Sequence, residues 1–226
     1  YLGMLLGTSI VFLLTALIWT YVLVGHLDFM PGGILNGKIE YGLLPLLLGL
    51  YAFGIGKAAL MPLHRWLPAA MVAPTPVSAL LHAVAVVKAG VFTILKVGVY
   101  IVGLDFLAES GASQWLIWLA AISIILASIF ALMQDNLKKR LAYSTVSQLS
   151  YITLAMALAT PMAAVGGGMH IAMHAFGKIA LFMCAGAIYV ATKKTEISDM
   201  SGLGKSMPIT FTIFACLLYT SPSPRD

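Results

Sequence analysis

The chain has 226 residues, of which 61% are hydrophobic and only 9% are charged, and its mean hydropathy is +0.98. Soluble domains carry about 25% charged residues, so the composition excludes a soluble domain and predicts an all-α polytopic membrane protein. The formal charge is +5, but the basic residues lie in short loops or inside apolar runs. The absence of a basic stripe excludes a nucleic-acid-binding protein.

Seven apolar runs predict helices. A helix crosses a bilayer with about 20 residues, so the first six runs are long enough to span and the seventh is too short. We therefore expect about six to seven transmembrane helices. The runs are Leu2–Gly25, Tyr41–Leu60, Val77–Gly103, Gln114–Met133, Leu141–Thr160, Ala163–Ala191 and Pro208–Tyr219.

The two ends of the chain suggest a fragment of a longer protein. The sequence starts at Tyr1 without a methionine and is apolar at once. At the other end, an apolar helix is cut off by the polar stretch SPSPRD, and residues 217–226 resemble translated vector sequence. We expect residues 1–216 to form the transmembrane domain and residues 217–226 to be a non-native tail. The alternative is a native polar terminus after a re-entrant segment.

Loop charges predict the orientation in the membrane. The odd-numbered connections between the runs hold only Lys38, whereas the even-numbered connections hold seven basic residues. Basic residues accumulate on the cytoplasmic side of membrane proteins. We therefore expect the Tyr1 end and the loops 134–140 and 192–207 to be cytoplasmic, in the cell (inner) membrane. The seven residues are Arg65, Lys138, Lys139, Arg140, Lys193, Lys194 and Lys205.

A proline-rich segment follows the second run. Prolines remove backbone donors and break helices, and a broken helix at membrane depth is tolerated where it lines a cavity or an ion site. The alternative is a loop at the membrane surface, where Arg65 and Trp66 would suit the interface. The structural helix breaks are expected at Pro62, Pro68, Pro74 and Pro76.

Four lysines fall inside the apolar runs: Lys57, Lys88, Lys96 and Lys178. A charge at the bilayer centre costs about 2.5–3.5 kcal/mol, so these lysines are expected to have a use. Burial disfavours the charged ammonium, and such a lysine can take up and release a proton. Lys96 lies near the end of its run, where the alternative is snorkelling to a headgroup. No Asp or Glu lies in any run.

Three titratable residues recur at helical spacing in the sixth run. His170, His174 and Lys178 stand at i, i+4 and i+8, which places them on one helix face. Histidine titrates near neutral pH, so this row predicts a proton relay, with structural hydrogen bonding as the alternative. Two histidines lack the third ligand that a metal needs, so no metal site is expected. His82, before Lys88, is a further relay candidate or a hydrogen-bonded core histidine.

A polar helix start follows the fourth run. The residues 141–148 read LAYSTVSQ, and such hydroxyls either line a polar path or bond across packed helices. Both interpretations stay open. Lys138, just before them, is a candidate for proton uptake from the cytoplasm, with a plain orientation charge as the alternative.

These motifs carry a family resemblance. Residues 62–82, 141–148 and 170–178 resemble the antiporter-like subunits of respiratory complex I and of Mrp cation/proton antiporters. The resemblance implies a longer bundle of two inverted repeats with broken helices in mid-membrane. It assigns Lys57 to the central lysine, Lys88 and His82 to its neighbours, and His174 with Lys178 to the second relay. Segments 86–90 and 195–200 look most like the D-type member of the Mrp antiporters.

The resemblance implies one subunit of a multi-subunit membrane complex that exchanges protons for Na⁺ or K⁺. The alternatives are a proton-pumping subunit of NADH:quinone oxidoreductase and a non-transporting scaffold. The sequence has no flavin, NAD or iron–sulfur motif, so we expect no cofactor and assign any redox chemistry to other subunits. It also lacks GxSxG and HExxH, so a catalytic site of its own is not expected. The expected partners are other membrane subunits, protons, Na⁺ or K⁺ and lipid.

Overall fold

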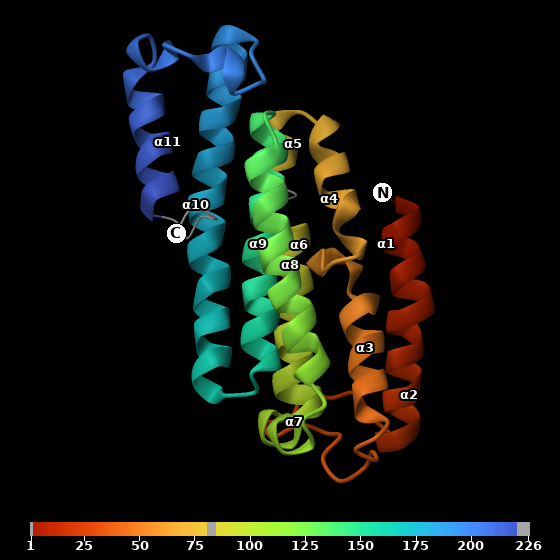
Figure 1. Ribbon diagram of the computed structural model, residues 1–226. Helices are drawn as coiled ribbons and strands as arrows, with labels where there is room; N and C mark the ends of the chain where they lie inside the picture. Colours follow the sequence, from red (N-terminus) through yellow and green to blue (C-terminus); the bar gives the residue numbers. More distant parts are fainter. Residues whose placement is uncertain (1, 81–84, 221–226) are drawn as a thin grey trace.

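The computed structural model describes residues 2–80 and 85–220, and the regular elements in these ranges are all helical (Figure 1). His82 and the end of the predicted tail lie outside the described residues. The first pass consists of α1 (Leu2–Thr8), a π-helical turn η1 (Ser9–Leu13) and α2 (Leu14–Val24). This pass agrees with the first predicted run.

The second pass is a broken helix, as one of the two sequence interpretations predicted. Helix α3 (Leu44–Gly54) ends in a break that holds the short turn η2 (Gly56–Ala58). Beyond the break the chain continues upward beside α9 (Leu137–Ala157; Figure 1). This second half consists of η3 (Leu63–Arg65), α4 (Trp66–Ala69) and η4 (Ala70–Val72).

Most of residues 62–76 is thus helical and not a loop, and the break expected at Pro68 is absent because Pro68 lies inside α4. Pro62 stands at the N-cap of η3, and Pro76 lies in the first turn of α5 (Thr75–Ala79). Proline is accepted at a helix start because the missing N–H has no helical partner there. These prolines thus begin new helical pieces after each break. Arg65 belongs to a helical piece and not to a connection, which corrects its assignment to a loop.

The third pass is also divided. After α5, the chain is described again from Ala85, and α6 (Val86–Lys96) continues into the π-helical η6 (Val97–Val102). At Gly103, whose φ is +91°, the chain bends by 81° into α7 (Leu104–Ser110). Within the single helix predicted over Val77–Gly103, the structure thus has α5 and α6 as two helices, and residues 81–84 between them lie outside the described residues.

The later passes follow the predicted runs closely. Helix α9 begins before the predicted Leu141, because the Asn136 side chain caps it by accepting a hydrogen bond from the Lys139 N–H at 3.2 Å. Thr160 caps α10 in the same way through the Ala163 N–H at 3.3 Å. The helices are α8 (Gln114–Met133), α9 (Leu137–Ala157), α10 (Pro161–Thr192), the short turns η7 (Ser198–Met200) and η8 (Leu203–Lys205), and α11 (Pro208–Thr220).

Among the described residues, three uninterrupted helices are long and apolar enough to cross a membrane: Gly3–Val24, Gln114–Met133 and Pro161–Thr192. The bent pair of residues 86–110 adds a fourth if it counts as one span. The remaining passes of the predicted bundle are shorter or more polar. Helix α3 ends at the break, and α9 has the length of a span but carries many buried polar side chains.

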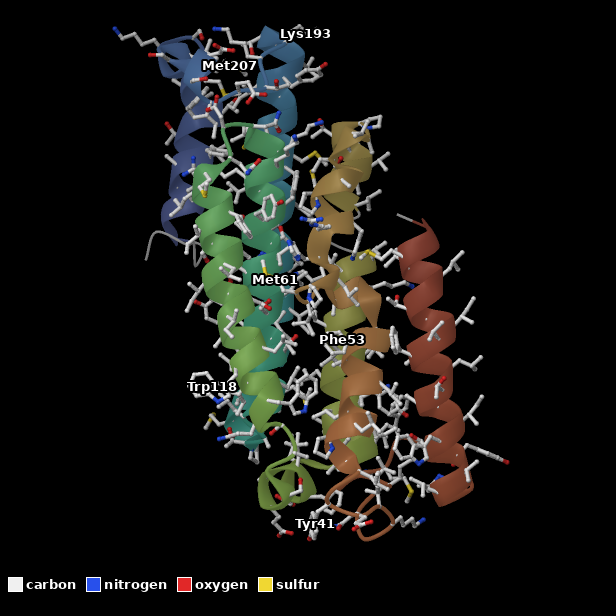
Figure 2. All side chains as sticks on the ribbon, turned by 45° about the vertical axis from the view of Figure 1, so that its right-hand side comes forward. Tyr41, Phe53, Met61, Trp118, Lys193 and Met207 are labelled. Carbon is white, nitrogen blue, oxygen red and sulfur yellow. The ribbon has the colours of Figure 1, made fainter. Side chains whose placement is uncertain are left out.

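The connections alternate between two ends of the bundle, as expected from the order of the predicted runs. Figure 1 places the α4–α5, α8–α9 and α10–α11 links at the upper end and α7 and the α9–α10 link at the lower end. In Figure 2, Lys193 and Met207 lie at the upper end, Tyr41 lies at the lower end, and Met61 of the break lies between them. The break therefore lies well inside the bundle.

Two upper connections are held together by hydrogen bonds. The Asp135 carboxylate accepts from the Ser198 N–H at 3.1 Å and from the Ser198 hydroxyl at 2.6 Å. These bonds hold the pKa of Asp135, which lies in the connection outside the spans, below its usual value. The Asn136 amide donates to Glu196 at 3.1 Å beside the backbone bridge of the same two residues. The start of α9 is thus tied to the link after α10.

Candidate functional site

Helices α6, α9 and α10 pack against one another and enclose a group of polar side chains. Lys88 of α6 is 5% exposed, and His174 and Lys178 of α10 are 3% and 4% exposed. Ser144 of α9 is also buried. Charged side chains are seldom buried without a partner, so the contacts of these residues decide what the group can do.

The Lys88 ammonium lies in hydrogen-bond contact with Nδ1 of His174. An ammonium can only donate, whereas an unprotonated ring nitrogen accepts. When Lys88 is charged, His174 therefore presents a bare Nδ1 to it. If the proton moves to Nδ1, the lysine becomes the acceptor. This contact connects α6 to α10, and its shared proton can reside on the Lys88 nitrogen or on Nδ1 of His174.

Lys178 lies one helical turn beyond His174 and donates from Nζ to the Ser144 hydroxyl of α9. The Ser144 hydroxyl in turn donates to the Leu141 carbonyl at 3.0 Å. In the described part of the chain, no ion pair joins Lys88 or Lys178 to a carboxylate; the described ion pair is His26 with Asp28, at 3.6 Å. The buried lysines are thus held by neutral groups.

His170 extends this row toward the lower end of α10. Its ring stacks on His174 with centroids 5.8 Å apart and an interplanar angle of 12°. The Tyr151 ring of α9 lies 6.5 Å from the ring of His170. The prediction that His170, His174 and Lys178 share one helix face is confirmed by the continuous α10 helix.

Lys57 does not join the group through its side chain. The sequence placed it inside a membrane span, but the structure places it in η2 of the break, and its side chain is exposed. Its backbone, however, packs directly against α6. A Cβ added at Gly90 would lie 2.6 Å from the Lys57 carbonyl carbon and 2.6 Å from the Ala58 nitrogen. The break therefore touches α6 two residues after Lys88.

Two further lysines lie away from the group. The Lys96 ammonium lies 3.8 Å from the centre of the Phe29 ring. The Lys138 ammonium lies 5.6 Å from the Tyr189 ring centre near the upper end, where Lys193 approaches the same ring at 5.5 Å. Neither lysine has a described contact with Lys88, His174 or Lys178.

Sequence reasoning left the role of α9 open and did not single out His64. The His64 ring of η3 is buried and lies 6.2 Å from the Tyr143 ring. Tyr143 precedes Ser144, so η3 is packed beside the same stretch of α9. For α9, the sequence signal was the high density of hydroxyl side chains within an apolar run. The buried polar residues of α9 are Ser144, Thr145, Ser147, Gln148, Ser150 and Thr153.

The group does not form a metal site of the usual kind. Across residues 2–80 and 85–220, no three His, Cys, Asp or Glu side chains gather closely enough to hold a metal ion. Lysine, imidazole and hydroxyl groups in contact can exchange protons or hydrogen bonds with one another.

Comparison with known proteins decides the family. Residues 1–222 match the family described as NADH:quinone oxidoreductase/Mrp antiporter, transmembrane. The chain belongs to this family. It is therefore embedded in a membrane, and the predicted all-α polytopic fold is confirmed.

Curated relatives come from both branches of the family. The A/B subunit of a probable K(+)/H(+) antiporter of Rhizobium meliloti is 40% identical over 183 residues, which are 80% of this chain and 18% of that protein. The L subunit of the NADH-quinone oxidoreductase of Pseudomonas aeruginosa is 39% identical over 169 residues, 74% of this chain and 26% of that protein. The chain therefore spans less than a third of these relatives' length. The narrower likeness to the D-type member of the Mrp antiporters stays a prediction.

Solved structures of membrane complexes share the fold. A chain of the membrane-bound sulfane sulfur reductase, an archaeal respiratory membrane complex, matches with a TM-score of 0.81 and 29% identity over 95% of this chain and 44% of that chain. A chain of the Mrp complex from Dietzia matches with a TM-score of 0.69 and 32% identity over 83% of this chain and 21% of that chain.

Proposed function

We propose that this chain conducts protons through Lys88, His174 and Lys178 as one membrane component of a multi-subunit complex that exchanges protons for Na⁺ or K⁺. The observation that carries the proposal is the buried contact between Lys88 and His174, which joins α6 to α10 without a carboxylate. Buried ionisable residues in membrane proteins are costly and mark ion and proton routes.

In this proposal, a proton moves along Lys88, His174 and Lys178 because a charge on one of these groups disfavours a charge on the next. A proton passes from Lys88 to Nδ1 of His174 within their hydrogen bond. Residues one helical turn apart lie about 6 Å from each other, and two charges at that distance repel by about 3 kcal/mol at an effective dielectric constant of about 20. A proton arriving on His174 therefore favours release of the proton on Lys178.

The neighbouring groups supply routes to and from this row. His170 extends it toward the lower end through its stacked ring. Lys57 is proposed to connect the break in the second pass to the proton path through Lys88, His174 and Lys178. His82 is proposed as a further residue of this path from its sequence position. Lys138 is proposed to take up protons at the upper end.

The upper end is proposed to face the cytoplasm, in the cell (inner) membrane. Six basic residues support this orientation, because basic residues favour the cytoplasmic side. Three lie in the first turn of α9, which corrects their assignment to a loop, and three lie in the α10–α11 link. Only Lys38 lies in the connection between the first two passes at the other end. The six are Lys138, Lys139, Arg140, Lys193, Lys194 and Lys205.

A proton-pumping subunit of an NADH:quinone oxidoreductase is the second candidate function, which the similarity to the L subunit of such an enzyme supports. Both functions use the same lysines and differ in what drives the protons. In the antiporter, a Na⁺ or K⁺ gradient changes proton flux. In the pump, quinone reduction by other subunits drives it. Measuring flux under each driving force separates the two.

The test of proton conduction uses the assembled complex in proteoliposomes. Lys88→Ala and Lys178→Ala are expected to lower proton flux by about a hundredfold, the contribution typical of a positioned proton-transfer group. Lys38→Ala is the matched control, because it removes an exposed lysine at the lower end. Flux that is unchanged in both variants, with normal assembly, would instead establish the non-transporting scaffold.

A further inference from the structure

The partner of Lys178 is a hydroxyl group where a carboxylate would be the usual choice. Its ammonium donates to Ser144 Oγ, and both side chains are buried. No ion pair with a carboxylate involves Lys178 within the described ranges. A carboxylate stabilises only the charged ammonium and thereby retains the proton on the lysine. A hydroxyl can hydrogen-bond both the charged ammonium and the neutral amine, because it can both donate and accept.

The Ser144 hydroxyl is already arranged for the charged lysine. Its hydrogen points to the Leu141 carbonyl at 3.0 Å, which leaves the oxygen lone pairs free to accept from Lys178. When Lys178 loses its proton, the amine nitrogen becomes an acceptor. The Ser144 hydrogen then has a second acceptor within reach and needs only to rotate about the Cβ–Oγ bond.

The Leu141 carbonyl stays satisfied when the Ser144 hydrogen turns away. The Thr145 hydroxyl donates to the same carbonyl at 2.8 Å. Leaving a buried acceptor unpaired costs about 1–3 kcal/mol, and the second donor removes that cost. The two acceptors, Leu141 O and Lys178 Nζ, are thus alternatives for one hydroxyl hydrogen.

We propose that Ser144 is a positioning residue for Lys178, whose hydroxyl accepts from the protonated lysine and donates to the deprotonated one. Ser144 gains and loses no proton; only the direction of its hydrogen bond changes. Lys178 is therefore held in one place in both protonation states, facing His174 on its own helix. This inference rests on the proposed role of Lys178 in proton conduction.

Other buried hydroxyls of α9 provide a matched control. Ser150 is 1% exposed and donates to the Val146 carbonyl at 3.0 Å, as Ser144 does to Leu141. It has no described hydrogen bond to a lysine. Replacing Ser150 with alanine therefore removes a buried hydroxyl from the same helix, without removing a partner of Lys178.

The experiment compares proton flux against pH for the assembled complex in proteoliposomes. Ser144→Ala removes a hydrogen bond from both forms of Lys178, but the bond to the charged ammonium is the stronger one, so the charged form loses more stabilisation than the neutral form. We expect Ser144→Ala to lower flux about tenfold, the effect of a lost hydrogen bond to a charged group, and to move the alkaline fall in flux about one pH unit lower. Ser144→Thr, which keeps the hydroxyl, restores both quantities, and Ser150→Ala matches wild type.

The outcomes separate this inference from the proposed function. If Lys178→Ala leaves flux unchanged, the conduction proposal itself fails. If Lys178→Ala abolishes flux but Ser144→Ala has the flux and pH profile of wild type, only the role of Ser144 is overturned. Should Ser144→Ala not assemble, Ser144→Cys replaces it, since a thiol of similar size is only a weak donor and acceptor. An unchanged pH profile in Ser144→Cys overturns the inference equally.

Discussion

At the scale of single residues, the candidate site depends on contacts between distant parts of the chain. Lys88 and His174 are 86 positions apart, and Lys178 and Ser144 are 34 positions apart. The sequence predicted each lysine and histidine as a candidate and placed His174 and Lys178 on one face, because helical spacing is a local property. Which side chains meet across helices depends on packing and could not be derived from spacing.

The Lys88–His174 pair predicts non-additive stability. Removing one partner leaves the other buried without its hydrogen bond, whereas removing both leaves no unpaired group. We expect Lys88→Met and His174→Leu each to destabilise the complex by about 1–3 kcal/mol, and the double variant to be more stable than the sum of the two effects. Thermal unfolding of the purified complex measures the three differences.

The control for this cycle is His170→Leu combined with Lys88→Met. His170 stacks on His174 but has no described hydrogen bond to Lys88. The effects of these two substitutions should be closer to additive. Strict additivity in the Lys88–His174 cycle would show that the contact contributes nothing to stability.

At the scale of helices, close approach between backbones places the break after α3 beside the helix that carries Lys88. Gly90 allows α6 to touch the backbone of Lys57 and Ala58. Gly54 does the same for α3, where an added Cβ would lie 2.5 Å from the Leu13 nitrogen in η1. The sequence predicted a break near Pro62, but it gave no sign that the Lys57 side chain is exposed, since exposure depends on neighbouring helices.

Gly90→Ala is expected to disturb the site through the backbone. The new methyl group would overlap main-chain atoms of η2, which cannot move aside as a flexible side chain can. Overpacking of this kind costs about 1–3 kcal/mol. We expect lower thermal stability of the assembled complex and reduced proton flux.

Gly166→Ala is the matched control for Gly90→Ala. Gly166 lies within α10, and an added Cβ there meets nothing within 4 Å. Alanine favours a helix over glycine by about 1 kcal/mol, so this variant should be as stable as wild type or more stable. Equal behaviour of the two variants would exclude a tight contact between α6 and the break.

At the scale of the whole molecule, the alternation of the connections was predictable and the divided helices were not. The order of the apolar runs is enough to sort the connections into two alternating sets, and Figure 1 places those sets at opposite ends. The division of the third pass into α5 and α6 was missed because its apolar run is uninterrupted after Pro76. In such a run, hydropathy alone does not distinguish one helix from two.

The proposed orientation predicts which end reacts with a reagent that cannot cross the membrane. In a background with Cys184→Ser and Cys216→Ser, Lys38→Cys should react with an impermeant maleimide added to intact cells. Lys193→Cys should react only after the membrane is opened. Both positions are exposed and lie at opposite ends of the bundle, so access to the reagent decides the result. The opposite pattern would invert the protein, place the basic connections outside, and move proton uptake at Lys138 to the outer side.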